Sequence, residues 1–431
     1  PQRWYGWLVG LILLLLGMIL ACVWLSATEA GFAVSWQIAE RLTSGAVVTT
    51  KVRGTLWQGF SLEGVRYQDD EVHVDIQHIA VDWRPSALFS QYALIVKKLA
   101  IGHVRIKRLR PSSSSPIKEP LSLALPLNIH INHLSLASLV IEPTLLYLYG
   151  IEASYHYDVG RRHAFRLVSL RSPWGKGSAY LNVAEAKPFV LRGEAQLDGL
   201  LDKVPFDAAL GVSGPMRSFS LQGSMGSPHL AAHIQGQFAP FAANSYGWVK
   251  RLDVRAGGVN PKAFSSTFPS ARLNVALRVE PIANNTLQGG LSLINLVPGN
   301  LNKESLPVKS LFAEFQVKNE ELSLSSVKAS LIQGEVGIVG RLSLRHLDLR
   351  ATLTGVNLPA LHAALTDDTV AGHMYLNGTP AMPRLALDIE GKHLSGAMQL
   401  AMSSAPKRQL MLTQFRLAAG MGKVEAQGHV D

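Results

Sequence analysis

The sequence predicts a mostly β protein in which an N-terminal transmembrane helix precedes a repetitive antiparallel β-sheet with a few short helices. Three observations lead to this fold class. Residues 6–26 form an almost wholly apolar run, apolar and polar residues alternate through most of the chain after residue 47, and one spacing of apolar residues recurs. Alternation with period two is typical of half-buried strands, and a recurring unit is typical of a repeated β architecture.

The recurring spacing is clearest at Phe60, Leu62, Val65 and Tyr67. One extra residue interrupts the alternation, and in a regular strand it would turn the later side chains to the other face. A β-bulge or tight bend at Glu63–Gly64 would keep all four on one face. Further copies are predicted at Val72 to Trp83, Leu99 to Ile106, Leu134 to Ile141, Leu322 to Ala329, Leu342 to Leu349 and Leu410 to Leu417.

The apolar run at residues 6–26 is long enough to cross the roughly 30 Å hydrocarbon core of a bilayer as a helix. Arg3 before it and Glu29 after it place residues 1–5 in the cytoplasm and the rest of the chain in the periplasm. Two alternatives remain open. One is a cleaved signal sequence, for which residues 26–30 match a cleavage site only poorly, and the other is a lipidated Cys22, because Ile19 to Cys22 resembles a lipobox. The residues assigned to the anchor are Trp7, Leu11, Leu14, Leu16, Ile19 and Trp24.

The remaining segments follow in order. Residues 27–110 form a first periplasmic β-region, with an amphipathic helix predicted over 32–42 and a short turn over 87–89. Residues 111–120, rich in proline and serine, form a linker. Residues 121–431 hold further β-repeats, with short helices or turns at 260–264 and 357–361. We expect the sequence to be part of a longer chain, because the alternation continues to residue 430.

The composition of the chain limits which partners the protein can have. Only 17% of the residues are charged, below the roughly 25% of soluble domains, so much of the surface must be apolar or neutral. The net charge of +10 favours anionic partners such as lipid headgroups. Nucleic acid is disfavoured because the basic cluster from Arg105 to Arg110 has no interleaved aromatic residues. We interpret that cluster as the solvent face of a strand.

Motifs for catalysis and for metals are missing from the sequence. It contains no P-loop, no Gly-x-Ser-x-Gly and no His-Glu-x-x-His. His130 and His133 are three residues apart, which would place them on opposite faces of a regular strand. We therefore predict no enzyme activity, no metal site and no cofactor.

Short phrases in a consistent order resemble the TamB family, within the AsmA-like group of bacterial envelope proteins. They are residues 54–65 (GTLWQGFSLEGV), 81–88 (VDWRPSAL), 99–106, 236–241 (GQFAPF) and 378–383 (GTPAMP). The resemblance implies an inner-membrane anchor, a curled periplasmic β-groove that conducts phospholipids between the membranes, and a link to outer-membrane protein assembly. It also implies an outer-membrane barrel partner of the TamA type.

Amphipathic sheets must cover their apolar faces, either by packing into a dry sandwich or by curling into a taco-like trough that holds acyl chains. Two other functions stay open: a chaperone that adds outer-membrane strands to a sheet edge, and a structural envelope spacer with a closed core. The candidate groove-lining residues are Phe60, Leu62, Val65, Leu99, Ile101, Val104, Leu134, Leu136, Leu139 and Ile141.

Overall fold

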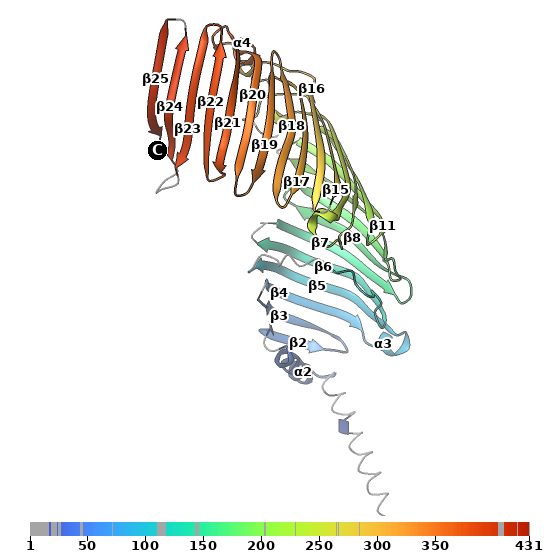
Figure 1. The fold of residues 1–431 in the computed structure, drawn as a ribbon. Coiled ribbons are helices and arrows are strands. Elements are labelled where there is room, and N and C mark those ends of the chain that lie inside the picture. The colour runs from blue at the N-terminus through green and yellow to red at the C-terminus, as the bar shows by residue number, and fades with distance from the viewer. Residues whose placement is uncertain are drawn as a thin grey trace, which may run out of the picture. The chain divides into compact units, whose positions relative to one another are not determined.

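The computed structural model describes residues 17–18, 24, 27–43, 46–70, 72–109, 118–142, 146–201, 204–228, 230–263, 265, 267–283, 285–403, 409–419 and 421–430. Over these residues the chain is mostly β, with 25 strands and a few short helices, as predicted (Figure 1). Nearly all of the predicted anchor at residues 6–26 lies outside the described residues. No helix in the described part is both long enough and apolar enough to cross a membrane.

The chain forms two compact units. The N-terminal unit comprises residues 1–199 with 211–216, and the C-terminal unit comprises residues 200–210 with 217–431. Strand β11 (Val204–Pro215) is divided between them. The described elements before β11 are α2 (Glu29–Leu42), β1 (Val47–Val48), β2 (Lys51–Thr55), β3 (Gly59–Gln68), β4 (Val72–Arg84), α3 (Ser86–Ser90), β5 (Ala93–Arg108), β6 (Asn128–Glu142), β7 (Leu146–Asp158), β8 (Arg162–Ser172), β9 (Gly175–Ala184) and β10 (Val190–Leu201).

From β2 to β10, each strand of the N-terminal unit pairs with the next one along the chain, and β1 pairs with β3. The pairing is antiparallel except between β5 and β6, which are parallel, with Ala93 opposite Asn128. The prediction of an antiparallel sheet is therefore wrong for this pair. A parallel neighbour requires a crossover connection, because the start of β6 at Asn128 lies beside the start of β5 at Ala93.

Helix α2 confirms the amphipathic helix predicted over 32–42 and starts three residues earlier. The Thr28 hydroxyl caps it by accepting a hydrogen bond from the Gly31 N–H at 3.0 Å. The buried ring of Phe32 packs against Phe60 with centroids 5.0 Å apart. The indole of Trp36 donates to the Thr49 hydroxyl at 2.9 Å. These contacts hold α2 against the first strands.

The C-terminal unit contains fourteen strands, β12 to β25, in which every strand is antiparallel to the next (Figure 1). Its elements are β12 (Phe219–Ser227), β13 (Leu230–Phe238), η1 (Ser245–Trp248), β14 (Val249–Val259), η2 (Pro261–Ala263), β15 (Leu273–Ala283), β16 (Thr286–Asn295), η3 (Leu301–Lys303), β17 (Val308–Lys318), β18 (Glu321–Leu331), β19 (Glu335–Ser343), β20 (Leu347–Asn357), α4 (Leu358–Leu361), β21 (Thr369–Thr379), β22 (Met382–Gly391), β23 (Leu394–Ser403), β24 (Gln409–Ala419) and β25 (Gly422–Val430). The short helices predicted at 260–264 and 357–361 are confirmed as η2 and α4.

The strand with an inserted slip is confirmed in most of its predicted copies. At the predicted places the strand pairing is interrupted in β3, β4, β5 and β6, and the register shifts in β18 and β24. The copy from Leu342 to Leu349 is instead a hairpin between β19 and β20, in which Leu342 lies opposite Leu347. Leu344 is at the turn and is 86% exposed. A tight turn and a slipped strand give the same local spacing, and strand pairing distinguishes them.

Candidate functional site

The candidate lining residues of the N-terminal unit lie beside one another in continuous apolar rows. Because paired residues share a face of the sheet, the register defines these rows across neighbouring strands. Across β3, β4, β5 and β6 the rows are Phe60–Val81–Leu99–Leu134, Leu62–Ile79–Ile101–Leu136, Val65–Ile76–Val104–Leu139 and Tyr67–Val74–Ile106–Ile141. All ten candidates therefore fall into one set of rows.

The interruptions of the alternation lie side by side in neighbouring strands and so keep these rows together. We call this line of interruptions across β3 to β7 the slip line. The two residues inserted between apolar positions are 63–64, 77–78, 102–103, 137–138 and 149–150 in β3 to β7, and they lie opposite one another. Gly64 and Gly150 have φ values of +64° and +57°, which glycine adopts without the Cβ penalty. The apolar rows before and after the slip line thus form one surface, which we call the apolar face of the N-terminal unit.

Burial shows how this apolar face is covered. Among the ten candidates, Leu62 and Val65 are buried and the other eight are half-buried. Side chains in the core of a dry sandwich would be almost fully buried. The apolar face is therefore only partly sealed by protein at most of the predicted positions.

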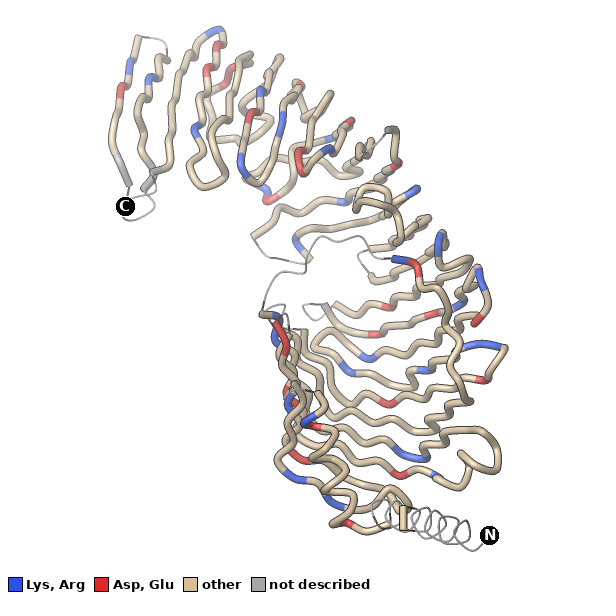
Figure 2. The backbone as a smooth tube through the Cα atoms, turned by 60° about the horizontal axis from the view of Figure 1, so that its bottom comes forward, with Lys and Arg blue, Asp and Glu red and all other residues tan. Residues whose placement is uncertain are grey.

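The opposite, polar face carries the charged side chains. Arg66 pairs with Asp75 at 3.3 Å, and Arg105 pairs with Glu142 at 3.8 Å. Arg105 and Lys107 are exposed while the intervening Ile106 is half-buried, which confirms the interpretation of the basic cluster as a solvent face. Figure 2 shows charged residues scattered along both units, separated by long uncharged stretches.

Part of the apolar face is closed by the connection between β5 and β6. Residues 118–127 run over the ends of β7 and β8, where the Leu125 N–H donates to the Tyr157 hydroxyl at 2.9 Å. That hydroxyl donates to Glu185 at 2.7 Å, and the His163 ring donates to the Leu123 carbonyl at 2.9 Å. Tyr157 is fully buried, and this burial raises its pKa. Apart from the proline-rich connection, no sequence pattern predicted this contact.

The C-terminal unit extends the same design over fourteen strands. One row crosses all of β12 to β25 without a polar side chain, and a second row beside it does the same. The first row is Gly223, Ile234, Val254, Leu277, Leu291, Ala313, Val327, Ile338, Ala351, Met374, Leu387, Met398, Phe415 and Ala426. Most of its members are half-buried. Sequence reasoning did not find these rows, because they become visible only once the strand register is known.

The buried core of this unit is small. A described cluster of buried side chains, Val356, Val370 and Leu394, lies at the strand ends near α4. Beside it the buried Asp368 carboxylate accepts hydrogen bonds from the N–H groups of His393 and Leu394 at 2.7 and 2.9 Å. The His393 N–H is the main cause of the lowered pKa of Asp368. This carboxylate ties the β22–β23 turn to the chain before β21.

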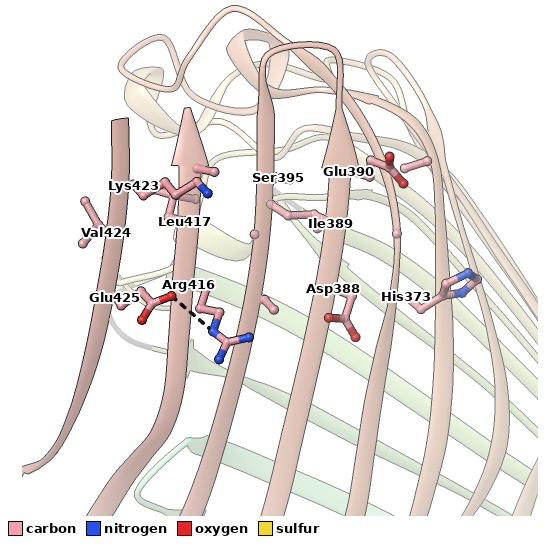
Figure 3. Close-up of a pocket in the computed structure, with 15 residues that line it drawn as sticks. His373, Asp388, Ile389, Glu390, Ser395, Arg416, Leu417, Lys423, Val424 and Glu425 are labelled. Atoms are coloured by element: carbon pink, nitrogen blue, oxygen red, sulfur yellow. Dashed lines mark ion pairs between the residues drawn. The ribbon is translucent and has the colours of Figure 1, made fainter. Parts of the chain in front are cut away.

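The hollow in Figure 3, about 650 Å³ in volume, lies on the polar face of β21 to β25. Its walls carry charges of both signs, and Arg416 pairs with Glu425 at 3.4 Å. Alternation puts the side chains of Ile389 and Leu417 on the other face, so the floor of the hollow is the strand backbone. Two further hollows, of 550 and 520 Å³, have the same construction. The 550 Å³ hollow is lined in part by Val254, Leu277, Leu291 and Ala313 of the first C-terminal row, and the 520 Å³ hollow in part by the candidates Val65 and Val104.

His130 of β6 makes an ordinary polar contact. His130 lies 3.0 Å from Asp158 and lowers the pKa of that carboxyl group. A bulge between Ile131 and Leu134 separates His130 from His133, so simple alternation does not assign their faces, contrary to the sequence argument. Within the described residues, no group of three or more His, Cys, Asp or Glu could hold a metal ion.

Residues 18–144 match the family model of the TamB N-terminal domain. This match confirms the resemblance to TamB for the stretch that ends just after β6. Comparisons with curated proteins and with solved structures find no match.

Proposed function

We propose, from the TamB N-terminal domain at residues 18–144 and the apolar rows of both units, that this protein carries phospholipids between the inner and outer membranes. Residues 6–26 anchor it in the inner membrane as a single-pass helix, and the sheets stand in the periplasm. In this proposal it acts as a TamB-like subunit of a translocation and assembly module, with an outer-membrane barrel protein of the TamA type as partner. No catalytic step is involved.

The observation that carries the proposal is the row from Gly223 to Ala426, which crosses fourteen strands without a polar side chain. Acyl chains need a continuous apolar lining, because any unpaired polar group along the way would have to be desolvated. Half-buried apolar side chains leave surface that a lipid tail can cover, and each buried CH₂ contributes about 0.8 kcal/mol. A curled, taco-like groove is the arrangement in which such a face holds lipid.

Photocrosslinking tests this proposal with matched positions. A benzophenone amino acid at Ile101 or Leu136 probes the apolar face, and one at Ala100 or Ser135 probes the polar face of the same strands. We expect phospholipid adducts at the first pair and not at the second. Polypeptide adducts would instead support the strand-adding chaperone, and the lack of any adduct at Ile101 and Leu136 would support a closed spacer.

A charge on the apolar face gives a second test. Ile101→Asp and Leu136→Asp should abolish lipid adducts while the protein stays folded, because a half-buried position lets the new carboxylate keep part of its hydration. Ala100→Asp, on the other face, is the control and should leave lipid adducts unchanged. Unfolding of both apolar-face variants would show that these positions form a dry core.

A further inference from the structure

We propose that the end of the N-terminal unit where α2 starts is a bilayer-contact surface, and that lipids enter the apolar face there. The surface is formed by Trp57, Phe89 and Tyr92, which we call the aromatic rim. This inference rests on the proposed function, because its partner is the surface of the membrane that holds the predicted anchor.

The aromatic rim gathers residues from two neighbouring turns. Trp57 lies in the turn between β2 and β3, and Phe89 and Tyr92 lie in the connection between β4 and β5 that contains α3 (Figure 1). Phe60, just after the first turn, is paired with Val81, just before the second connection. Both turns are therefore at the same end of the strands.

The rim side chains are held outward. Phe89 and Tyr92 are 75% and 79% exposed, and Trp57 is 46% exposed. The buried Ala87 and Ala93 fix α3 and the start of β5 beneath them. Tyr92 has a φ of +50°, a conformation that costs a tyrosine energy and persists only where the surrounding structure imposes it. The fold thus presents two large aromatic rings to the surroundings of the protein.

The chain itself indicates what these rings contact. The predicted anchor ends at residue 26, three residues before α2 begins, and Phe32 in the first turn of α2 packs against Phe60. Phe60 is three residues from Trp57, so α2 starts at the end that carries the rim. Aromatic rings favour the membrane–water interface, where an apolar body and a polar tip both find partners.

The charges at the two ends of these strands also differ. Arg84, exposed at the end of β4, lies beside the rim and can pair with a lipid phosphate. The turn at the opposite end of β3 and β4 carries Asp69 and Asp70, which repel an anionic membrane surface. The rim end thus carries an exposed cation, Arg84, while the opposite end carries these acidic residues together with Lys107 and Arg108 of β5.

The rim also adjoins the first apolar row. Phe60, Val81 and Leu99 are the members of the apolar rows nearest to the two turns. Trp83 follows Val81 on the same side of β4, and its indole N–H is buried without a hydrogen-bond partner. A buried donor without an acceptor costs free energy, and an ester oxygen of an entering lipid would satisfy it.

Site-specific fluorescence in proteoliposomes tests the contact on the full chain. In a Cys22→Ser background, Phe89→Cys and Asp70→Cys are each labelled with NBD and reconstituted in phosphatidylethanolamine vesicles that contain phosphatidylglycerol. We expect a blue-shifted emission and quenching by doxyl lipid for the label at 89 and neither for the label at 70. Equal quenching at both positions, or none at 89, would overturn the proposal.

A double variant tests the entrance separately. Phe89→Ser with Tyr92→Ser should reduce lipid adducts at a photocrosslinker placed at Ile101 several-fold, with the protein still membrane-bound and folded by circular dichroism. Unchanged adducts would refute the rim as the entrance and leave the proposed function intact. The NBD measurement reports membrane contact whether or not lipid occupies the apolar face. If the proposed function is wrong, lipid adducts will already be missing in the protein without the double substitution.

Discussion

Gly64→Ala is the substitution that most directly tests how the slip line holds the apolar face together. Gly64 has a φ of +64°, and a Cβ added there would lie 2.4 Å from the Thr50 hydroxyl oxygen and 3.0 Å from the Thr50 Cβ. The left-handed conformation costs a non-glycine residue about 1–2 kcal/mol. Reduced freedom of the unfolded chain offsets about 0.4–1 kcal/mol of this cost.

The contact with Thr50 adds a second cost. Forcing a methyl group into an occupied position typically costs about 1–3 kcal/mol. We therefore expect Gly64→Ala to destabilise β3 by about 1–5 kcal/mol, from these two costs less the offset of the unfolded chain. Gly160→Ala is the control, because Gly160 has a φ of +76° but nothing within 4 Å of the added Cβ. It should cost about 1 kcal/mol or less, from the backbone alone.

Hydrogen exchange followed by mass spectrometry measures the effect locally, which suits a chain of two units for which a single unfolding transition is not expected. Amides of β3 and β4 should lose protection in Gly64→Ala. Adding Thr50→Ala should restore part of it, with a coupling of about 1 kcal/mol, within the range for residues in contact. Equal loss of protection in Gly64→Ala and Gly160→Ala, or no recovery on adding Thr50→Ala, would refute the reasoning.

Three further predictions concern the attachments of the sheet. Phe32→Ala should destabilise the α2 contact by about 3–5 kcal/mol, seen as lost amide protection in α2, whereas Val34→Ala on the exposed side of the helix should stay within about 0.5 kcal/mol of wild type. The pKa of Asp368 is lowered in the folded state, so the carboxylate contributes its full stabilisation of the fold above its ordinary pKa of 3.8. This contribution is lost as the pH falls through the lower pKa of the folded state. Asp368→Asn should therefore weaken the protein at pH 7 and flatten its stability profile in acid, and an unchanged acid profile would contradict this role. Tyr157→Phe removes the hydroxyl that holds residues 118–127 and should speed tryptic cleavage after the exposed Lys118; an unchanged rate would show that other contacts hold the segment.

The alternation of apolar residues predicted most of the strands and the slips of β3 to β6, β18 and β24. In β3, β5 and β6 the apolar residues recur at i, i+2, i+5 and i+7, and a strand of period two can bury such a set on one face only if it contains a bulge. The amphipathic helix at 32–42 was also predicted from local sequence alone, because its apolar residues recur at helical spacing.

Partners far apart in the chain could not be predicted in this way. Leu342 to Leu349 has the spacing of a slipped strand, yet its two halves pair with each other as a hairpin. The parallel pairing of β5 with β6 depends on where residues 109–127 lead the chain, and no periodicity records that path.

The sequence by itself therefore determined many of the strands, which of their side chains are apolar and where β3 to β6, β18 and β24 are interrupted. These properties follow from the two-residue period of a single strand and need no neighbour. Only the tertiary structure decided that the slips of β3 to β7 coincide and that one apolar row crosses fourteen strands. Register is a property of pairs of strands, because the hydrogen bonds between them fix which side chains become neighbours.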